Sequence, residues 1–283
     1  MIAFSVLIPV YIKENPAFLR LALKSVLDDQ TLKPNEMVIV EDGPLTEELT
    51  AVLDDFSARY PIIKRYKLPE NRGMGAAMNF GLQKATCEWI ARMDSDDIAT
   101  PDRFAKQVAV LTKNPDIDVL GSAIEEFDKT MGDLGRYRVL AKTHEDLVKL
   151  MKFRSPINHM TVFYRRELAL RAGGYWSNRH LEDYNLWYEM MKAGGKFYNI
   201  QESLVLVRVG NNMIGRRIGT EYFGYEKVLL KKFLHDKFIT YYEYLVLTTG
   251  KFMLRLLPPQ ILGTFYSVFL RRSVLHPAEE PGA

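Results

Sequence analysis

The sequence predicts an α/β protein whose mainly parallel sheet is flanked by helices and followed by a helical C-terminal extension rich in basic and aromatic residues. In the first half of the chain, short apolar runs of strand length alternate with longer segments of helical periodicity, which is typical of βαβ units. The 283 residues are 47% hydrophobic and 26% charged, which suits a globular chain with a sizeable core. This composition excludes disordered, collagen-like and coiled-coil proteins.

Local signals place the individual elements. The first strand, 4–10, is apolar except at Ser5, and Pro16 then opens a helix, since proline suits the first helical turn. Thr46 and the acidic residues after it begin the next helix, where the helix dipole favours negative charge. Further strands are expected at 37–40, 62–68, 89–93, 119–124 and 160–164, with edge strands at 196–200 and 204–209. Further helices are expected at 74–85, 101–111, 143–152 and 181–193, and a hairpin or mobile excursion at 125–142.

The charge is unevenly distributed. The net charge of +3 is too small to require a nucleic-acid partner. Residues 205–272, however, hold eleven Lys and Arg against four Asp and Glu, so this tail carries +7 and the rest of the chain −4. The single Cys87 excludes an internal disulfide, the N-terminus lacks a signal-peptide pattern, and no apolar run approaches the roughly 18 residues of a spanning helix. A cytoplasmic protein is expected.

Polar residues follow four of the expected strands, where ligands bind in open α/β sheets. These segments are Pro9-Val10-Tyr11, Glu41-Asp42-Gly43, Asn71-Arg72-Gly73 and Asp94-Ser95-Asp96-Asp97. Each of them alone could be an ordinary turn. The last is more informative, because three carboxylates within four residues repel one another unless they are solvated or share a cation. A Mg or Mn ion that also binds a diphosphate is the natural partner. The alternative is an acidic turn that caps the helix near Pro101, which would account for Asp97.

The segment around Arg72 favours a nucleotide. Its guanidinium suits a planar base or a phosphate, and Gly73 and Gly75 permit close approach of the backbone. A dinucleotide-binding fingerprint is disfavoured because Met78 stands where the third glycine is needed, and the chain has no Walker Gly-Lys-Ser/Thr.

Five segments together resemble the family 2 inverting glycosyltransferases of bacterial surface-polysaccharide synthesis. They are SVLIPVY at 5–11, IVEDG at 39–43, NRG at 71–73, MDSDD at 93–97 with PDR at 101–103, and LEDYNLW at 181–187. Their order and approximate spacing match over about residues 4–210. The resemblance implies a Rossmann-like GT-A fold over residues 1–212, with a nucleotide-binding half at about 1–98 and an acceptor half at 99–212. Residues 213–283 would form the helical extension.

The resemblance also implies roles for particular residues. Asp183 matches the general base, Asp42 would bond the base of the nucleotide, and Asp96 together with Asp94 would hold a divalent Mn or Mg. His159 and Glu182 would approach the acceptor or the diphosphate, although His159 could equally be a structural histidine beside a strand. The nucleotide-sugar site would comprise Pro9, Val10, Tyr11, Glu14, Asp42, Arg72, Gly73, Asp94, Ser95, Asp96 and Arg208.

The implied reaction moves one sugar from a nucleotide sugar to a glycan or to a saccharide linked to polyprenyl diphosphate, by single displacement with inversion. Uridine diphosphate is favoured because it is common in the family, and the absence of a Gln-x-x-Arg-Trp segment favours one sugar per encounter. Two alternatives remain open. A sugar nucleotidyltransferase would need a glycine-rich loop after the first strand, which Pro9 to Glu14 does not provide, and a non-catalytic nucleotide-sugar or glycan-binding module would not need the acidic cluster and the base.

The tail from about Tyr222 to Arg272 interleaves aromatic residues with lysines and arginines. Such segments can lie on an anionic membrane surface, which would bring the enzyme to a lipid-linked acceptor at the inner face of the plasma membrane. They can also form a helical subdomain that packs its aromatic rings on the core. The two interpretations are compatible.

Overall fold

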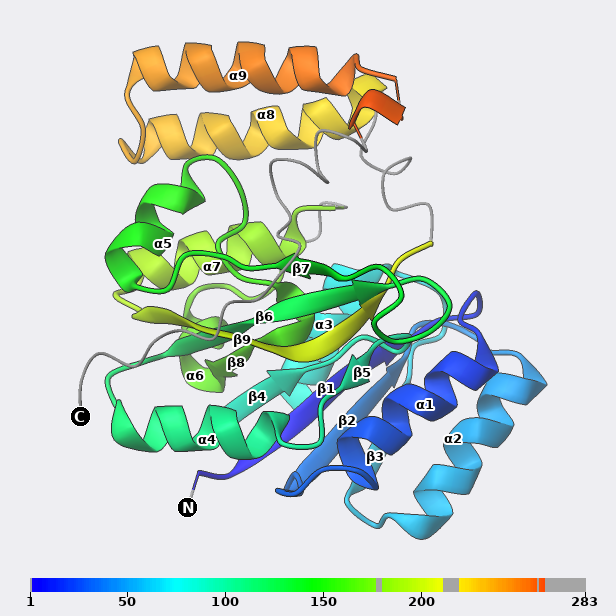
Figure 1. The fold of residues 1–283 in the computed structure, drawn as a ribbon. Coiled ribbons are helices and arrows are strands. Elements are labelled where there is room, and N and C mark those ends of the chain that lie inside the picture. Colours follow the sequence, from blue (N-terminus) through cyan, green and yellow to red (C-terminus); the bar gives the residue numbers. More distant parts are fainter. Residues whose placement is uncertain (1, 177–179, 211–218, 259, 263–283) are drawn as a thin grey trace.

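The structure is a computed structural model that describes residues 2–176, 180–210, 219–258 and 260–262 (Figure 1). The described strands form one sheet in the order β3-β2-β1-β4-β8-β6-β9-β5, with β7 paired to β6. Their bounds are β1 Phe4–Val10, β2 Glu36–Glu41, β3 Ile63–Lys67, β4 Trp89–Arg92, β5 Ile98–Ala99, β6 Val119–Phe127, β7 Arg136–Arg138, β8 Phe163–Arg165 and β9 Phe197–Arg208.

The sheet is mostly parallel, as the sequence predicted. β3, β2, β1 and β4 are paired in parallel, and β6 and β9 continue in the same direction beyond the antiparallel β8. The short β5 and β7 are antiparallel to their partners. The predicted hairpin at 125–142 is confirmed, since β6 turns back as β7.

The prediction of two edge strands at 196–200 and 204–209 is wrong. These residues form a single strand, β9, which lies between β6 and β5. Gln201 and Glu202 interrupt the apolar pattern but not the strand. The register passes from Ser122 opposite Ile200 to Ala123 opposite Ser203, so the two polar residues form a bulge. The expected strand at 160–164 begins with a single 3₁₀ turn, His159–Thr161, before β8.

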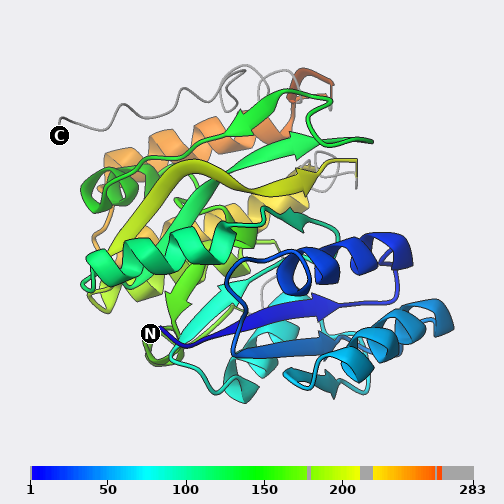
Figure 2. The same ribbon diagram turned by 60° about the horizontal axis from the view of Figure 1, so that its bottom comes forward.

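Helices cover both faces of the sheet (Figure 2). Because strand side chains alternate between faces, Val6 and Ile8 pack on one side of β1 and Leu7 on the other. The first face is covered by α1 Pro16–Leu27, α2 Glu47–Arg59 and α4 Arg103–Lys113. The second is covered by α3 Met74–Lys84, α5 His144–Met151, α6 Arg166–Arg171 and α7 Glu182–Lys192.

The C-terminal extension is helical where it is described, as predicted. α8 Gly219–His235 and α9 Tyr241–Arg255 form a hairpin in which α8 lies between α9 and the helices α5 and α7 (Figure 1). The Phe233 ring lies 4.4 Å from that of Tyr188 in α7, and Lys232 Nζ donates to Asn185 Oδ1 at 2.8 Å. The hairpin is therefore packed on the core. Part of the expected tail, including Phe265, Tyr266 and Phe269, lies outside the described residues.

Candidate active site

The carboxyl ends of β1, β2 and β4 bring the predicted site residues to one edge of the sheet. Val10 is opposite Glu41 in the register, and the backbone N of Asp42 donates to the Val10 carbonyl at 2.8 Å. The backbone N of Met93, just before the acidic cluster, donates to the Leu7 carbonyl at 3.2 Å. Parallel pairing thus fixes the three segments relative to one another.

The chain after β1 supplies the outer part of this edge. Pro9 and Val10 are buried in the strand, whereas the Tyr11 side chain is exposed. The backbone N of Glu14 donates to the Tyr11 carbonyl at 3.1 Å, which forms the turn that leads into α1. An exposed aromatic ring above a buried strand end can stack on a planar ligand.

Asp42 holds the turn that carries Arg72. The Asp42 side chain is buried, its Oδ1 accepts the backbone N–H of Arg72 at 2.7 Å, and its Oδ2 accepts that of Gly73 at 3.0 Å. Gly73 is the N-cap residue of α3 and has φ of 87°, a backbone conformation that favours glycine. The Arg72 side chain is exposed at the rim. Asp42 therefore fixes the backbone of the 71–73 turn, in addition to any contact that it makes with a ligand.

The acidic cluster is compact. Asp94, Asp96 and Asp97 each offer a carboxylate oxygen, and these three oxygens lie within 4.8 Å of one another. Asp97 is buried, and its pKa is raised well above the usual range by burial first and then by the charges of Asp94 and Asp96. Ser95 is buried between them.

Asp97 does not cap the helix after Pro101. Its Oδ1 instead accepts the backbone N–H of Arg208 at 2.9 Å, so it connects the cluster to the end of β9. Helix α4 begins after Asp102, whose side chain makes no capping hydrogen bond. Asp97 therefore makes a hydrogen bond to a residue 111 positions away in sequence instead of the expected local capping hydrogen bond.

Arg208 itself is the last residue of β9. Its guanidinium lies 3.7 Å from the centre of the Phe18 ring of α1 and 4.5 Å from that of Phe127 in β6. These contacts fix the end of β9 beside the acidic cluster.

The residue that the sequence reasoning missed is Arg92. It ends β4, is 2% exposed, and forms an ion pair with Asp94. Its Nη2 also donates to Met74 Sδ at 3.6 Å, and its Nε and Nη1 have no hydrogen-bond partner in the described part of the chain. An arginine at the end of an otherwise apolar strand, two residues before an acidic cluster, is the signal that could have revealed it.

The start of α7 faces the start of α3, and Glu182 and Asp183 are its first two residues. A Cβ on Gly75 would lie 2.3 Å from the Trp176 carbonyl oxygen and 3.4 Å from Glu182 Cβ, so the two helix starts touch. Burial, followed by the charge of Asp183, raises the pKa of Glu182 to about 7. Glu182 Oε2 is buried without a hydrogen-bond partner among the described residues. The nearby Arg92 charge acts in the opposite direction on this pKa.

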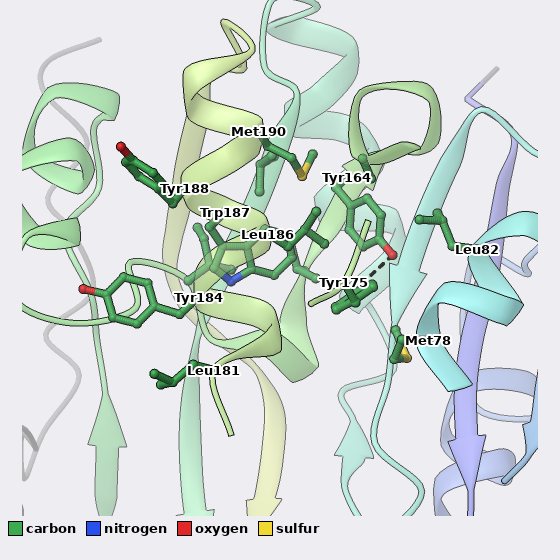
Figure 3. Packing of buried hydrophobic residues seen from close by; sticks show 14 of the residues in the cluster. Met78, Leu82, Tyr164, Tyr175, Leu181, Tyr184, Leu186, Trp187, Tyr188 and Met190 are labelled. Carbon is green, nitrogen blue, oxygen red and sulfur yellow. Dashed lines mark hydrogen bonds between the residues drawn. The ribbon is translucent and has the colours of Figure 1, made fainter. Parts of the chain in front are cut away.

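His159 is half-buried under α7, where its Nε2 lies 3.1 Å from the Tyr175 hydroxyl. Tyr175 in turn donates to the Tyr164 hydroxyl at 3.2 Å (Figure 3). The His159 ring lies 5.9 Å from the Trp187 ring. Burial and then the charge of Arg92 lower the pKa of His159 well below its usual range. The imidazole is neutral at pH 7.

The cluster fits a divalent cation. Mg and Mn prefer carboxylate oxygens, and three such oxygens gather here. Asp97 Oδ2 is buried without a hydrogen-bond partner in the described chain, and a cation would offset the repulsion that raises the pKa of this carboxyl.

The site combines an acidic cluster at the strand ends of a mostly parallel sheet with two carboxylates at the start of α7, a combination expected of a GT-A glycosyltransferase. Residues 5–172 match the family described as "Glycosyl transferase family 2", and the chain belongs to this family. Membership of this family sets aside the nucleotidyltransferase and the non-catalytic module.

Three relatives align with nearly the whole chain. An uncharacterized glycosyltransferase of Haemophilus influenzae is 39% identical over 95% of this chain and 99% of its own. The UDP-Gal:alpha-D-GlcNAc-diphosphoundecaprenol beta-1,3-galactosyltransferase of Escherichia coli is 36% identical over 95% and 97%. The amylovoran biosynthesis glycosyltransferase AmsE of Erwinia amylovora is 36% identical over 93% and 97%.

Two solved structures share the fold. S. aureus TarS 1–349 superposes with a TM-score of 0.61 at 17% identity, covering 95% of this chain and 73% of its own. The mannosyltransferase PcManGT of Pyrobaculum calidifontis, solved with GDP-Man and Mn2+, gives a TM-score of 0.60 at 17% identity over 92% and 72%.

Proposed function

We propose that the protein transfers one sugar from a UDP-sugar to a saccharide linked to polyprenyl diphosphate, in surface-polysaccharide synthesis. The observation that carries this proposal is the arrangement of the site, in which Arg92 pairs with Asp94 of the acidic cluster and its charge also acts on Glu182 at the start of α7. The similarity to an Escherichia coli enzyme named for UDP-Gal and a diphosphoundecaprenol-linked sugar supports the donor and acceptor classes.

The donor occupies the edge formed by β1, β2 and β4. In this proposal, Pro9, Val10, Tyr11 and Glu14 surround the nucleoside, and Asp42, Arg72 and Gly73 are placed on the base side. Residues 1–98 bind the nucleotide, and residues 99–212 complete the acceptor side. Asp94 and Asp96 hold Mn or Mg with Ser95 beside them, and Arg208 lies at the outer limit of the site. The ion, when bound, stabilises the negative charge of the departing diphosphate.

Asp183 acts as the general base. It takes the proton from the acceptor hydroxyl while that oxygen attacks the anomeric carbon, and the configuration at this carbon inverts. Such a base typically contributes about 10²–10⁴-fold to the rate. The raised pKa of Glu182 supports this division of roles, because a carboxyl with a pKa of about 7 is only about half ionised at pH 7, so its neighbour Asp183 is the better proton acceptor. In this proposal, Glu182 and the neutral His159 contact the acceptor or the diphosphate.

Two substitutions test these roles separately. Asp183→Asn should lower turnover by at least about 100-fold and leave the calorimetric affinity for UDP in Mn unchanged. Asp96→Asn should weaken UDP binding in Mn and leave the weak binding in EDTA as it is. Near-normal turnover of Asp183→Asn would remove Asp183 from the role of base.

A donor and acceptor screen tests the overall reaction. The full chain is incubated in Mn with UDP-galactose, UDP-glucose, UDP-N-acetylglucosamine or GDP-mannose and with a short lipid diphosphate that bears one sugar. The proposal predicts that a UDP-sugar gives a product with one added residue and an anomeric configuration opposite to that of the donor. A donor configuration retained in the product, or transfer from GDP-mannose alone, would contradict it. The acceptor class implies work at the cytoplasmic side of a membrane, and no helix in the described residues is long and apolar enough to cross one.

A further inference from the structure

The outer face of α9 is apolar although the helix lies at the surface. Its exposed side chains follow one another every three or four residues, so they share one face of the helix. Tyr242 is 76% exposed, Met253 58% and Leu245 46%. The exposed large hydrophobic residues of α9 and the position just after it are Tyr241, Tyr242, Leu245, Val246, Phe252, Met253 and Leu256. These seven residues are called the α9 outer face below.

The charged residues of α9 are turned away from this face. Glu226 of α8 is buried and accepts from Arg255 Nε and Nη2 at 2.8 Å each and from Lys251 Nζ at 2.8 Å. Glu243 forms an ion pair at 2.8 Å with Lys152, the residue that follows α5. The orientation is thus the reverse of that of an ordinary surface helix, in which charged side chains face the water. The ion pairs make it a defined feature of the fold, because a helix rotated about its axis would lose all of them.

Three exposed lysines belong to the same helical hairpin. Lys227 and Lys231 project from α8, and Lys237 is in the turn that joins the two helices. No ion pair engages these three lysines within the described residues. An apolar face with aromatic residues and a basic margin is typical of helices that lie in the plane of an anionic bilayer. Tyrosines such as Tyr241 and Tyr242 favour the depth of the headgroups, because the ring is apolar and the hydroxyl is polar.

A second copy of the chain fits this surface less well. In a two-fold dimer the same patch meets itself, so the lysines at the margin of one copy would approach those of the other. The face carries no carboxylate to compensate for them. Anionic lipid headgroups supply that charge.

We propose that the α9 outer face inserts into the headgroup region of an anionic membrane and that Lys227, Lys231 and Lys237 bind its phosphates. The axis of α9 then lies in the plane of the bilayer, and α8 and the catalytic domain are on the side of α9 that faces away from the membrane. The role of this surface in catalysis rests on the proposed lipid-linked acceptor, which would be reached in the same membrane plane. Binding to lipid does not depend on that acceptor.

The test is flotation of the full chain with vesicles that contain no acceptor. Vesicles of phosphatidylcholine with about one-third phosphatidylglycerol are compared with pure phosphatidylcholine, at low salt and at about 0.5 M salt, which screens exposed charges. The double substitution Leu245→Glu with Met253→Glu should lower the partition coefficient on anionic vesicles at least tenfold. Leu21→Glu is the matched control, because Leu21 of α1 is 44% exposed and Leu245 is 46% exposed. This substitution should change binding less than twofold.

Further measurements distinguish membrane insertion of α9 from dimer formation. Replacement of Lys227, Lys231 and Lys237 by Gln should reduce binding to anionic vesicles by about fivefold per lysine and leave binding to neutral vesicles unchanged. Leu245→Trp should show a blue-shifted emission on vesicles and quenching by brominated lipid. Unchanged flotation of the double variant with unshifted Trp emission would overturn the proposal, as would a wild-type dimer in light scattering that the double variant converts to a monomer. Calorimetric binding of UDP in Mn should be equal in all variants, which separates failure of this proposal from failure of the proposed activity.

Discussion

Substitution of Asp42 is expected to destabilise the donor edge of the sheet. The carboxylate accepts two backbone N–H groups, from Arg72 at 2.7 Å and Gly73 at 3.0 Å, and the side chain is 4% exposed. Hydrogen bonds to a charged acceptor contribute about 1.5–3 kcal/mol each. Because the 71–73 turn is partly exposed, water can satisfy part of what is lost. We expect Asp42→Ala to lower the free energy of unfolding by about 3 kcal/mol.

Asp42→Asn makes the test more specific. Asparagine has the same shape and keeps one acceptor oxygen, but its amide nitrogen must then face a backbone N–H group. The expected loss is therefore about 1.5–3 kcal/mol, measured by urea unfolding with the fluorescence of the three tryptophans. UDP affinity should fall as well, because the same turn carries Arg72.

The matched control is Asp116→Asn. Asp116 is exposed and pairs with Lys196 at 3.1 Å, so its loss should cost less than about 1 kcal/mol. Equal unfolding free energies for Asp42→Asn and the wild-type protein would refute the argument that this carboxylate holds the turn.

Three further predictions concern packing and ionisation. Glu226→Ala should lower the free energy of unfolding by about 3–5 kcal/mol in urea, because it leaves Lys251 and the buried Arg255 without their shared carboxylate; a loss below about 1 kcal/mol would contradict this. Gly75→Ala should cost about 1–3 kcal/mol, since its Cβ would lie 2.3 Å from the Trp176 carbonyl oxygen, whereas Gly224→Ala in α8, with open space around it, should be neutral or stabilising. Glu182 has a folded pKa of about 7, raised from 4.5, so its stabilising contribution is complete below pH 4.5 and is lost as the pH rises through 7. The unfolding free energy of the wild-type protein should fall between pH 5 and 8, and in Glu182→Gln this fall should be smaller by about 1–3 kcal/mol. The measurement is urea unfolding at each pH, and the same fall in both proteins would argue against a raised pKa.

Much of the fold follows from local pattern. β1 is apolar except at Ser5 because both faces of a central strand are buried. Thr46 caps α2 by accepting the backbone N–H of Leu49, as its position before an acidic turn predicted. Short elements such as β5 and α6 were not predicted, because segments of two and six residues carry too little periodicity.

The sequence predicted the position of some site residues, but not all of their interactions. Asp42 and Asp94 to Asp97 could be placed at one edge, because parallel strands deliver the residues that follow them to the same side of a sheet. The motifs did not predict the hydrogen bond between Asp97 and Arg208 or the ion pair of Arg92. Asp97 and Arg208 are 111 residues apart in sequence, and the burial of Arg92 depends on the elements packed around it, so only the folded chain decides both.

The C-terminal hairpin shows this division most clearly. Composition alone determined that the tail is basic and aromatic, because those properties are sums over residues. Only the tertiary structure decided which side of α9 meets the water: Glu226 draws Lys251 and Arg255 inward, and Leu245 and Met253 are left outside. A buried carboxylate needs its cations close by, and that requirement across two helices outweighs the usual preference of charged side chains for solvent.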